Sequence, residues 1–114
     1  MKDPEREAYA PMVRKVLEDA ARTGKRSFLT AYQILDRLPD AERAQLIAVH
    51  SAVGGLGAGT NDTATNAIAH ILSNNLAEEV EEPAHFDARG AQFKVGDDKI
   101  ESRDPALGLY RLKP

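Results

Sequence analysis

Residues 54–72 read GGLGAGTNDTATNAIAHIL, a glycine-rich run followed by a regular alternation of apolar and polar residues. Between residues 63 and 74 the apolar side chains recur at the spacing of one helical face: Ala64, Ala67, Ile68, Ile71 and Leu72. The polar side chains fall on the opposite face: Asn66, His70, Ser73 and Asn74. The pattern predicts a helix over residues 63–74, with Asn61 or Asp62 as its N-cap.

Two signals upstream predict another helix over about residues 11–23. Pro11 suits a first helical turn, because a proline there loses no intrahelical hydrogen bond. Gly24 supplies a C-terminal stop. Residues 1–10 are polar and lack periodicity, so we expect them to form a flexible N-terminal tail.

The segment between these two helices predicts a pair of short helices. Thr30 and Gln33 have the spacing of a capping box, so a helix begins after Thr30, and Pro39 ends it. A following helix runs from Asp40 to about His50. Its inward-facing side chains are expected to be Leu46 and Val49, with Val53 as a further candidate.

After Pro83 the period changes from helix to strand. Residues 85–87 form a candidate strand, residues 92–95 and 99–101 alternate around the turn signal Gly96-Asp97-Asp98, and residues 109–112 form a last strand. A hairpin alone is marginally stable, so it must lean on the helices. We therefore predict an α+β fold: four helices followed by a C-terminal antiparallel β-hairpin or three-stranded sheet, in a single domain over residues 11–114.

Composition limits the function more than it defines it. The 114 residues contain no Cys, which excludes a disulfide framework and a thiolate nucleophile or metal ligand. No apolar run is long enough to span a bilayer, and the charged N-terminus lacks the apolar core of a signal peptide. We expect a cytoplasmic protein that does not enter the membrane. The net charge of −3 weighs against a strong general nucleic-acid binder.

The order of the elements resembles the winged-helix plan. The resemblance covers about residues 11–112 and rests on a helix, the extended link Ser27-Phe28-Leu29, a helix opened by Thr30, a further helix and a C-terminal hairpin. It implies that residues 63–74 are a recognition helix and residues 92–101 a wing. The chain departs from the plan where a third helix and the glycine run separate two helices that the family joins by a tight turn. The chain is also similar to short uncharacterised proteobacterial proteins, which implies no activity.

The leading functional prediction is a non-enzymatic binding module that contacts nucleic acid. Amide and imidazole groups on residues 63–74 can reach base edges or phosphates, and nearby cations can supply phosphate contacts. The candidate residues are Lys25, Arg26, Asn66, His70, Asn74 and Lys94. The alternative for the helix is a solvated polar face, because residues 61–76 contain no Lys or Arg.

The glycine run offers a different function, an anion site at the start of the helix. Gly57, Gly59 and Thr60 would let a phosphate approach the backbone. The run lacks the Lys that a P-loop requires after its second glycine, because Thr60 follows Gly59. A flexible connector is the favoured interpretation, and a phosphate-ligand-binding protein is the alternative.

A protein-interaction module is the remaining alternative. It would use the edge of the hairpin for strand addition or the acidic run Glu78–Glu82 for charge pairing, although such a run is usually a solvated linker. The three histidines lack metal-ligand spacing, and no serine has the context of a hydrolase nucleophile. We expect no catalytic residues, no metal and no cofactor.

Overall fold

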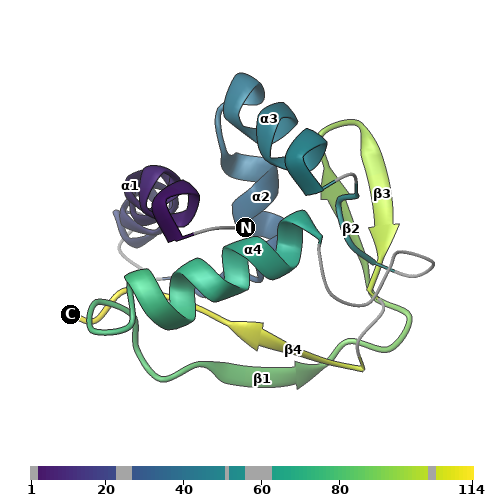
Figure 1. Cartoon of the computed structure of the whole chain (residues 1–114). Coiled ribbons are helices and arrows are strands. Elements are labelled where there is room, and N and C mark those ends of the chain that lie inside the picture. The colour runs from purple at the N-terminus through teal and green to yellow at the C-terminus, as the bar shows by residue number, and fades with distance from the viewer. Residues whose placement is uncertain (1–2, 23–26, 51, 56–62, 103–104) are drawn as a thin grey trace.

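The computed structural model describes residues 3–22, 27–50, 52–55, 63–102 and 105–114. Helices come first and antiparallel strands follow, so the predicted α+β class is confirmed (Figure 1). The elements are α1 (Asp3–Ala21), α2 (Ala31–Arg37), α3 (Asp40–His50), α4 (Ala64–His70), the π-helical turn η1 (Ile71–Asn75), β1 (Ala84–Asp87), β2 (Gln92–Val95), β3 (Asp98–Glu101) and β4 (Ala106–Leu109).

Helix α1 begins at Asp3, so the prediction of a tail over residues 1–10 is wrong from residue 3 onward. Pro11 lies inside the helix and is exposed, and it does not start the helix. The reason is that Tyr9 and Ala10 continue the buried stripe of Val13 by one helical turn. Burial of an aromatic side chain offsets the hydrogen bond that Pro11 removes.

The boundaries of α2 and α3 agree with the prediction, but the buried face of α3 differs from it in part. Thr30 caps α2 with both bonds of the capping box. On α3, Leu46 is fully buried, whereas Val49 is 50% exposed and was wrongly predicted to face inward. His50 takes the buried position, because it lies one helical turn beyond Leu46 on the same face.

Helix α4 is capped by Thr63, whose hydroxyl accepts a hydrogen bond from the backbone N–H of Asn66, so the predicted cap at Asn61 or Asp62 is wrong. The helix widens after His70, and the N–H of Leu76 bonds to the carbonyl of Ile71, five residues back. This wider turn keeps Ile71, Leu72 and Leu76 buried, and it packs η1 against α1.

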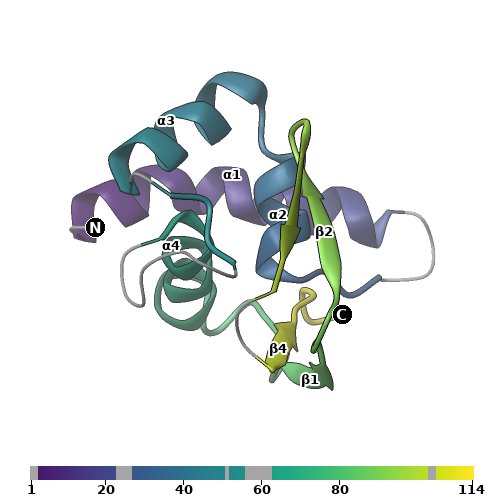
Figure 2. The same cartoon turned by 90° about the vertical axis from the view of Figure 1, so that its right-hand side faces the viewer.

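The strands form one bent ribbon of two short sheets (Figures 1 and 2). β1 pairs with β4, and β2 pairs with β3 in the predicted hairpin. The links between the sheets, residues 88–91 and 102–105, have equal length, so the pairing keeps its register across the bend. The last strand was predicted at 109–112, but β4 ends at Leu109 and only isolated bridges follow.

Those bridges lie at the end of the ribbon farthest from the β2–β3 turn, which we call its base. Leu29, between α1 and α2, pairs with Tyr110, and Val80 pairs with Leu112. Residues 78–82 were expected to be a solvated linker, but their ordered turn leads directly into the Val80 bridge. The acidic segment is therefore part of the folded ribbon.

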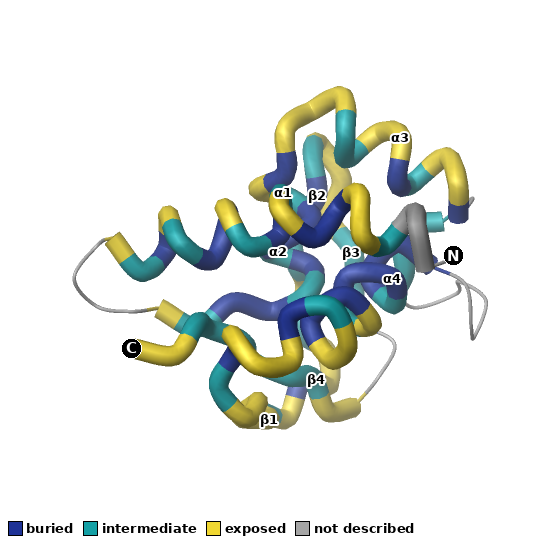
Figure 3. The backbone as a smooth tube through the Cα atoms, turned by 60° about the vertical axis from the view of Figure 1, so that its left-hand side comes forward, coloured by how far each residue is buried: buried dark blue, intermediate teal, exposed yellow. Residues whose placement is uncertain are grey.

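The ribbon and the helices share one core of buried side chains (Figure 3). The rings of Tyr32 on α2 and Phe93 on β2 stack with centroids 4.9 Å apart and planes inclined by 8°. Gly55 adopts φ +94° and approaches the backbone of β3, where an added Cβ would lie 2.7 Å from the carbonyl oxygen of Glu101. Gly55 thus has a structural role in packing the hairpin.

Candidate nucleic-acid interface

The polar face predicted for the fourth helix exists and lies on α4 and η1. His70 and Asn74 are exposed, and Asn66 is half-buried one turn before His70. The side-chain amide of Asn74 donates to the carbonyl oxygen of His70 at 2.9 Å. Residues 64–75 include no Asp or Glu, so this face carries hydrogen-bonding groups without negative charge.

Lys94 lies on the hairpin and not on the helical face. Its cross-strand partner is Lys99, so two cations stand side by side on one face of the β2–β3 pair. The ammonium of Lys94 approaches Asp36 of α2 at 3.3 Å, and its side chain remains 71% exposed. The same carboxylate accepts from the backbone N–H of Gly96 at 2.9 Å, which ties the hairpin turn to the helix.

The structure therefore gathers only part of the predicted site. Asn66, His70 and Asn74 share one helical face, while Lys94 belongs to a separate surface that packs against α2. Lys25 and Arg26 lie outside the described residues.

The alternative anion site at the start of α4 is not supported by the hydrogen bonds there. The N–H groups of Ala64 and Thr65 donate to the carbonyls of Ala52 and Val53, each at 3.0 Å. The next N–H, that of Asn66, is taken by the Thr63 hydroxyl. The first turn of α4 thus has no free backbone donor for a phosphate. Gly57, Gly59 and Thr60 lie outside the described residues.

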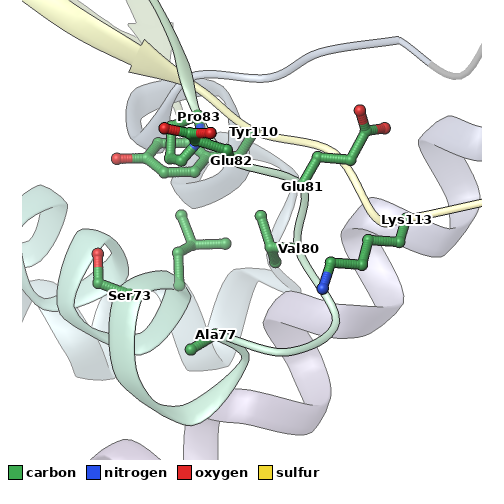
Figure 4. A pocket seen from close by; sticks show the side chains of 9 residues that line it. Ser73, Ala77, Val80, Glu81, Glu82, Pro83, Tyr110 and Lys113 are labelled. Atoms are coloured by element: carbon green, nitrogen blue, oxygen red, sulfur yellow. The ribbon is translucent and has the colours of Figure 1, made fainter.

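A cleft that the sequence did not reveal runs between η1 and the base of the ribbon. Its volume is about 470 Å³, and its walls include Leu72, Ser73, Val80, Glu82 and Tyr110. Figure 4 shows the Tyr110 ring beside Pro83 and Glu82, with Lys113 at the other side. Burial raises the pKa of the Tyr110 phenol above its ordinary value.

Tyr110 also lines a smaller cleft of about 190 Å³, together with Asn66 and His85. Its ring folds back across Gly108, where an added Cβ would lie 2.6 Å from the phenolic oxygen. The one sequence signal for this arrangement is a glycine two residues before a tyrosine in a strand, because residues i and i+2 share a face. That signal is too common to identify a cleft by itself.

Carboxylates neutralise several cations of the described surface. Arg14 binds Glu79 at 2.7 Å, and this hydrogen bond lowers the pKa of the Glu79 carboxyl below its usual value. Arg111 binds Glu81 at 2.7 Å and lies 4.1 Å from the centroid of the Phe28 ring. Two acidic side chains of the run 78–82 are therefore already paired within the chain.

Among the described residues, no cluster of three or more His, Asp or Glu side chains could hold a metal ion. Within those residues, too, no helix has the length and apolar character needed to cross a bilayer.

Comparisons of the chain with models of protein families, with curated proteins and with solved structures find no match. The function is therefore inferred from the geometry described above.

Proposed function

We propose that the chain is a non-enzymatic binding module of winged-helix-like plan that contacts nucleic acid through α4–η1 and the β2–β3 hairpin. The order of elements supports this plan, with α4 as the helix before the hairpin. The bridge between Leu29 and Tyr110 adds support, because it joins the segment between α1 and α2 to the residue directly after β4.

The observation that carries the proposal is the chemistry of the α4–η1 face. Its exposed groups are the amide and imidazole of Asn74 and His70, which match the donors and acceptors of base edges. The absence of carboxylates from residues 64–75 removes the repulsion that phosphates would meet on α1, α2 and α3, each of which contains acidic residues. Electrostatic repulsion of a polyanion is therefore weaker at this helix than at α1, α2 or α3.

Phosphate contacts come from the hairpin in this proposal. Lys94 and Lys99 are neighbours across the strands, and the contact of Lys94 with Asp36 is a long surface ion pair of small energetic value. Lys25 and Arg26 are expected to add further contacts. Since salt bridges pair most arginines of the described residues, we expect weak binding that salt abolishes.

The test is fluorescence anisotropy with a labelled mixed-sequence DNA duplex at a series of salt concentrations. The variant Lys94→Glu/Lys99→Glu should weaken binding and lower the slope of log affinity against log salt by about one for each lost phosphate contact. The control is Lys15→Glu on α1, which makes the charge change of one of these two substitutions and should alter affinity much less than Lys94→Glu alone.

A second pair of variants tests the helix itself. His70→Ala and Asn74→Ala should weaken binding without changing the salt slope, because neither removes a cation. If the wild-type protein shows no salt-dependent binding to duplex DNA or to RNA, the proposal is wrong. A partner captured equally well after nuclease treatment would identify a protein-interaction module instead.

A further inference from the structure

Strand β1 has an open edge, and the pairing with β4 shows which groups lie on it. The N–H of Ala88 donates to the carbonyl of Pro105 at 2.8 Å, directly after the β1–β4 pairing. Hydrogen-bonded pairs alternate along an antiparallel ladder, so Phe86 and Ala84 direct their backbone groups toward β4. His85 and Asp87 direct their backbone N–H and carbonyl groups away from β4.

These outward groups have no backbone partner among the described residues. In all three views of the whole molecule β1 lies at the rim, and no described element covers its outer side (Figures 1, 2 and 3). Ala84, His85 and Asp87 are exposed. An uncovered strand edge is a template for another strand.

We propose that this edge binds the same edge of a second copy of the chain, with the two β1 strands antiparallel about a two-fold axis at Phe86. In this register His85 of each copy lies opposite Asp87 of the other. Both backbone groups of His85 and both of Asp87 then find partners. The inference is independent of nucleic-acid binding.

The side chains select this register over its neighbours. A shift of two residues either way would place His85 opposite itself or Asp87 opposite itself, and it would leave part of each edge unpaired. The proposed register instead sets an imidazole beside a carboxylate at two symmetric places. Arg89 donates to the Asp87 carboxylate at 2.6 Å and so orients that side chain before the strands meet.

Phe86 strengthens the centre of the interface. It would form a non-hydrogen-bonded pair with its own copy, the closer kind of antiparallel pair, so the two rings would approach across the axis. The side chain is half-buried in the single chain and retains an accessible surface.

The fold also limits the assembly to a dimer. β1 has four residues, and the ribbon bends over residues 88–91, so a second strand cannot extend its pairing along the molecule. The contact uses the same patch on both copies and closes on itself. Because such an interface is small, we expect a dimer that dissociates on dilution.

Sedimentation equilibrium over a range of protein concentrations tests the proposal. The wild-type chain should show a reversible monomer–dimer equilibrium. His85→Asp should raise the dimer dissociation constant about tenfold or more, because it replaces two attractive cross-strand pairs by two repulsive ones. Gln45→Asp, on the exposed side of α3, is the matched control and should leave the constant unchanged. Circular dichroism of each variant should show that it remains folded.

The charge exchange tests the register. Asp87→His should also weaken the dimer, and the double variant His85→Asp/Asp87→His should restore it, because an imidazole then lies opposite a carboxylate again. A wild-type protein that is monomeric at every concentration would overturn the proposal. So would a dimer that His85→Asp leaves unchanged, or single variants that the double variant does not rescue.

Discussion

Gly55 and Gly90 form a natural pair for testing how the hairpin packs on the helical part. Both have positive φ, +94° and +75°, so an alanine at either position carries a backbone penalty of about 1–2 kcal/mol. At Gly90 nothing lies within 4 Å of an added Cβ. At Gly55 the Cβ would collide with the Ile100 side chain and would lie 2.7 Å from the Glu101 carbonyl oxygen. Overpacking of this kind costs a further ~1–3 kcal/mol.

The assay is urea unfolding of the wild type, Gly55→Ala and Gly90→Ala. We expect Gly90→Ala to lower the free energy of unfolding by about 1–2 kcal/mol, the backbone penalty alone. Gly55→Ala should lower it by about 2–5 kcal/mol, the two penalties together. The amide signals of β3 should shift in Gly55→Ala and not in Gly90→Ala. Equal losses in the two variants would refute the reasoning, because the contact between Gly55 and β3 would then contribute nothing.

Three further outcomes follow from the helices and the ion pairs. Thr30→Ala removes the capping hydroxyl of α2 and should lower the free energy of unfolding by about 0.5–2 kcal/mol in urea, whereas Thr30→Ser should restore most of it. Ile68→Ala should cost ~2–5 kcal/mol by calorimetry, because Ile68 is fully buried in α4. Arg14 lowers the pKa of Glu79, so the stability from this pair is present above the unfolded-state pKa and is lost as the pH falls through the folded-state pKa. Both side chains are well exposed, so the loss is small, and the pH–stability curves of the wild type and Glu79→Gln should converge in acid.

Local signals in the sequence predicted most of the secondary structure. The capping box at Thr30, the stop at Pro39 and the turn at Gly96 each act through the backbone within a few residues, and each lies where it was predicted. The apolar periodicity of α4 likewise identified its buried face. Such signals depend on neighbours in the chain and need no knowledge of the fold.

The errors arose where distant parts of the chain decide the outcome. Pro11 resembles a helix start, but burial of Tyr9 extends α1 through it. The acidic run resembles a linker, but Arg14 and Arg111 from other elements bind two of its side chains. Neither the burial of Tyr9 nor these ion pairs can be read from the neighbouring residues in the sequence.

In the candidate site, too, local features were predicted and features that depend on tertiary contacts were not. The polar stripe of α4 was predicted because it follows from helical spacing. The position of Lys94 relative to that stripe, the cleft beside Tyr110 and the open edge of β1 depend on how the ribbon bends and packs. Only the tertiary structure could reveal them.

The most direct test of the central claim is an amide ¹⁵N–¹H NMR titration with mixed-sequence duplex DNA at low salt, repeated at higher salt. The proposed interface predicts that signals of His70, Asn74, Lys94 and Lys99 shift together at low salt and return toward their free positions at higher salt. If these signals stay fixed while the DNA is added, α4 is a solvated surface, and the module does not bind nucleic acid through it.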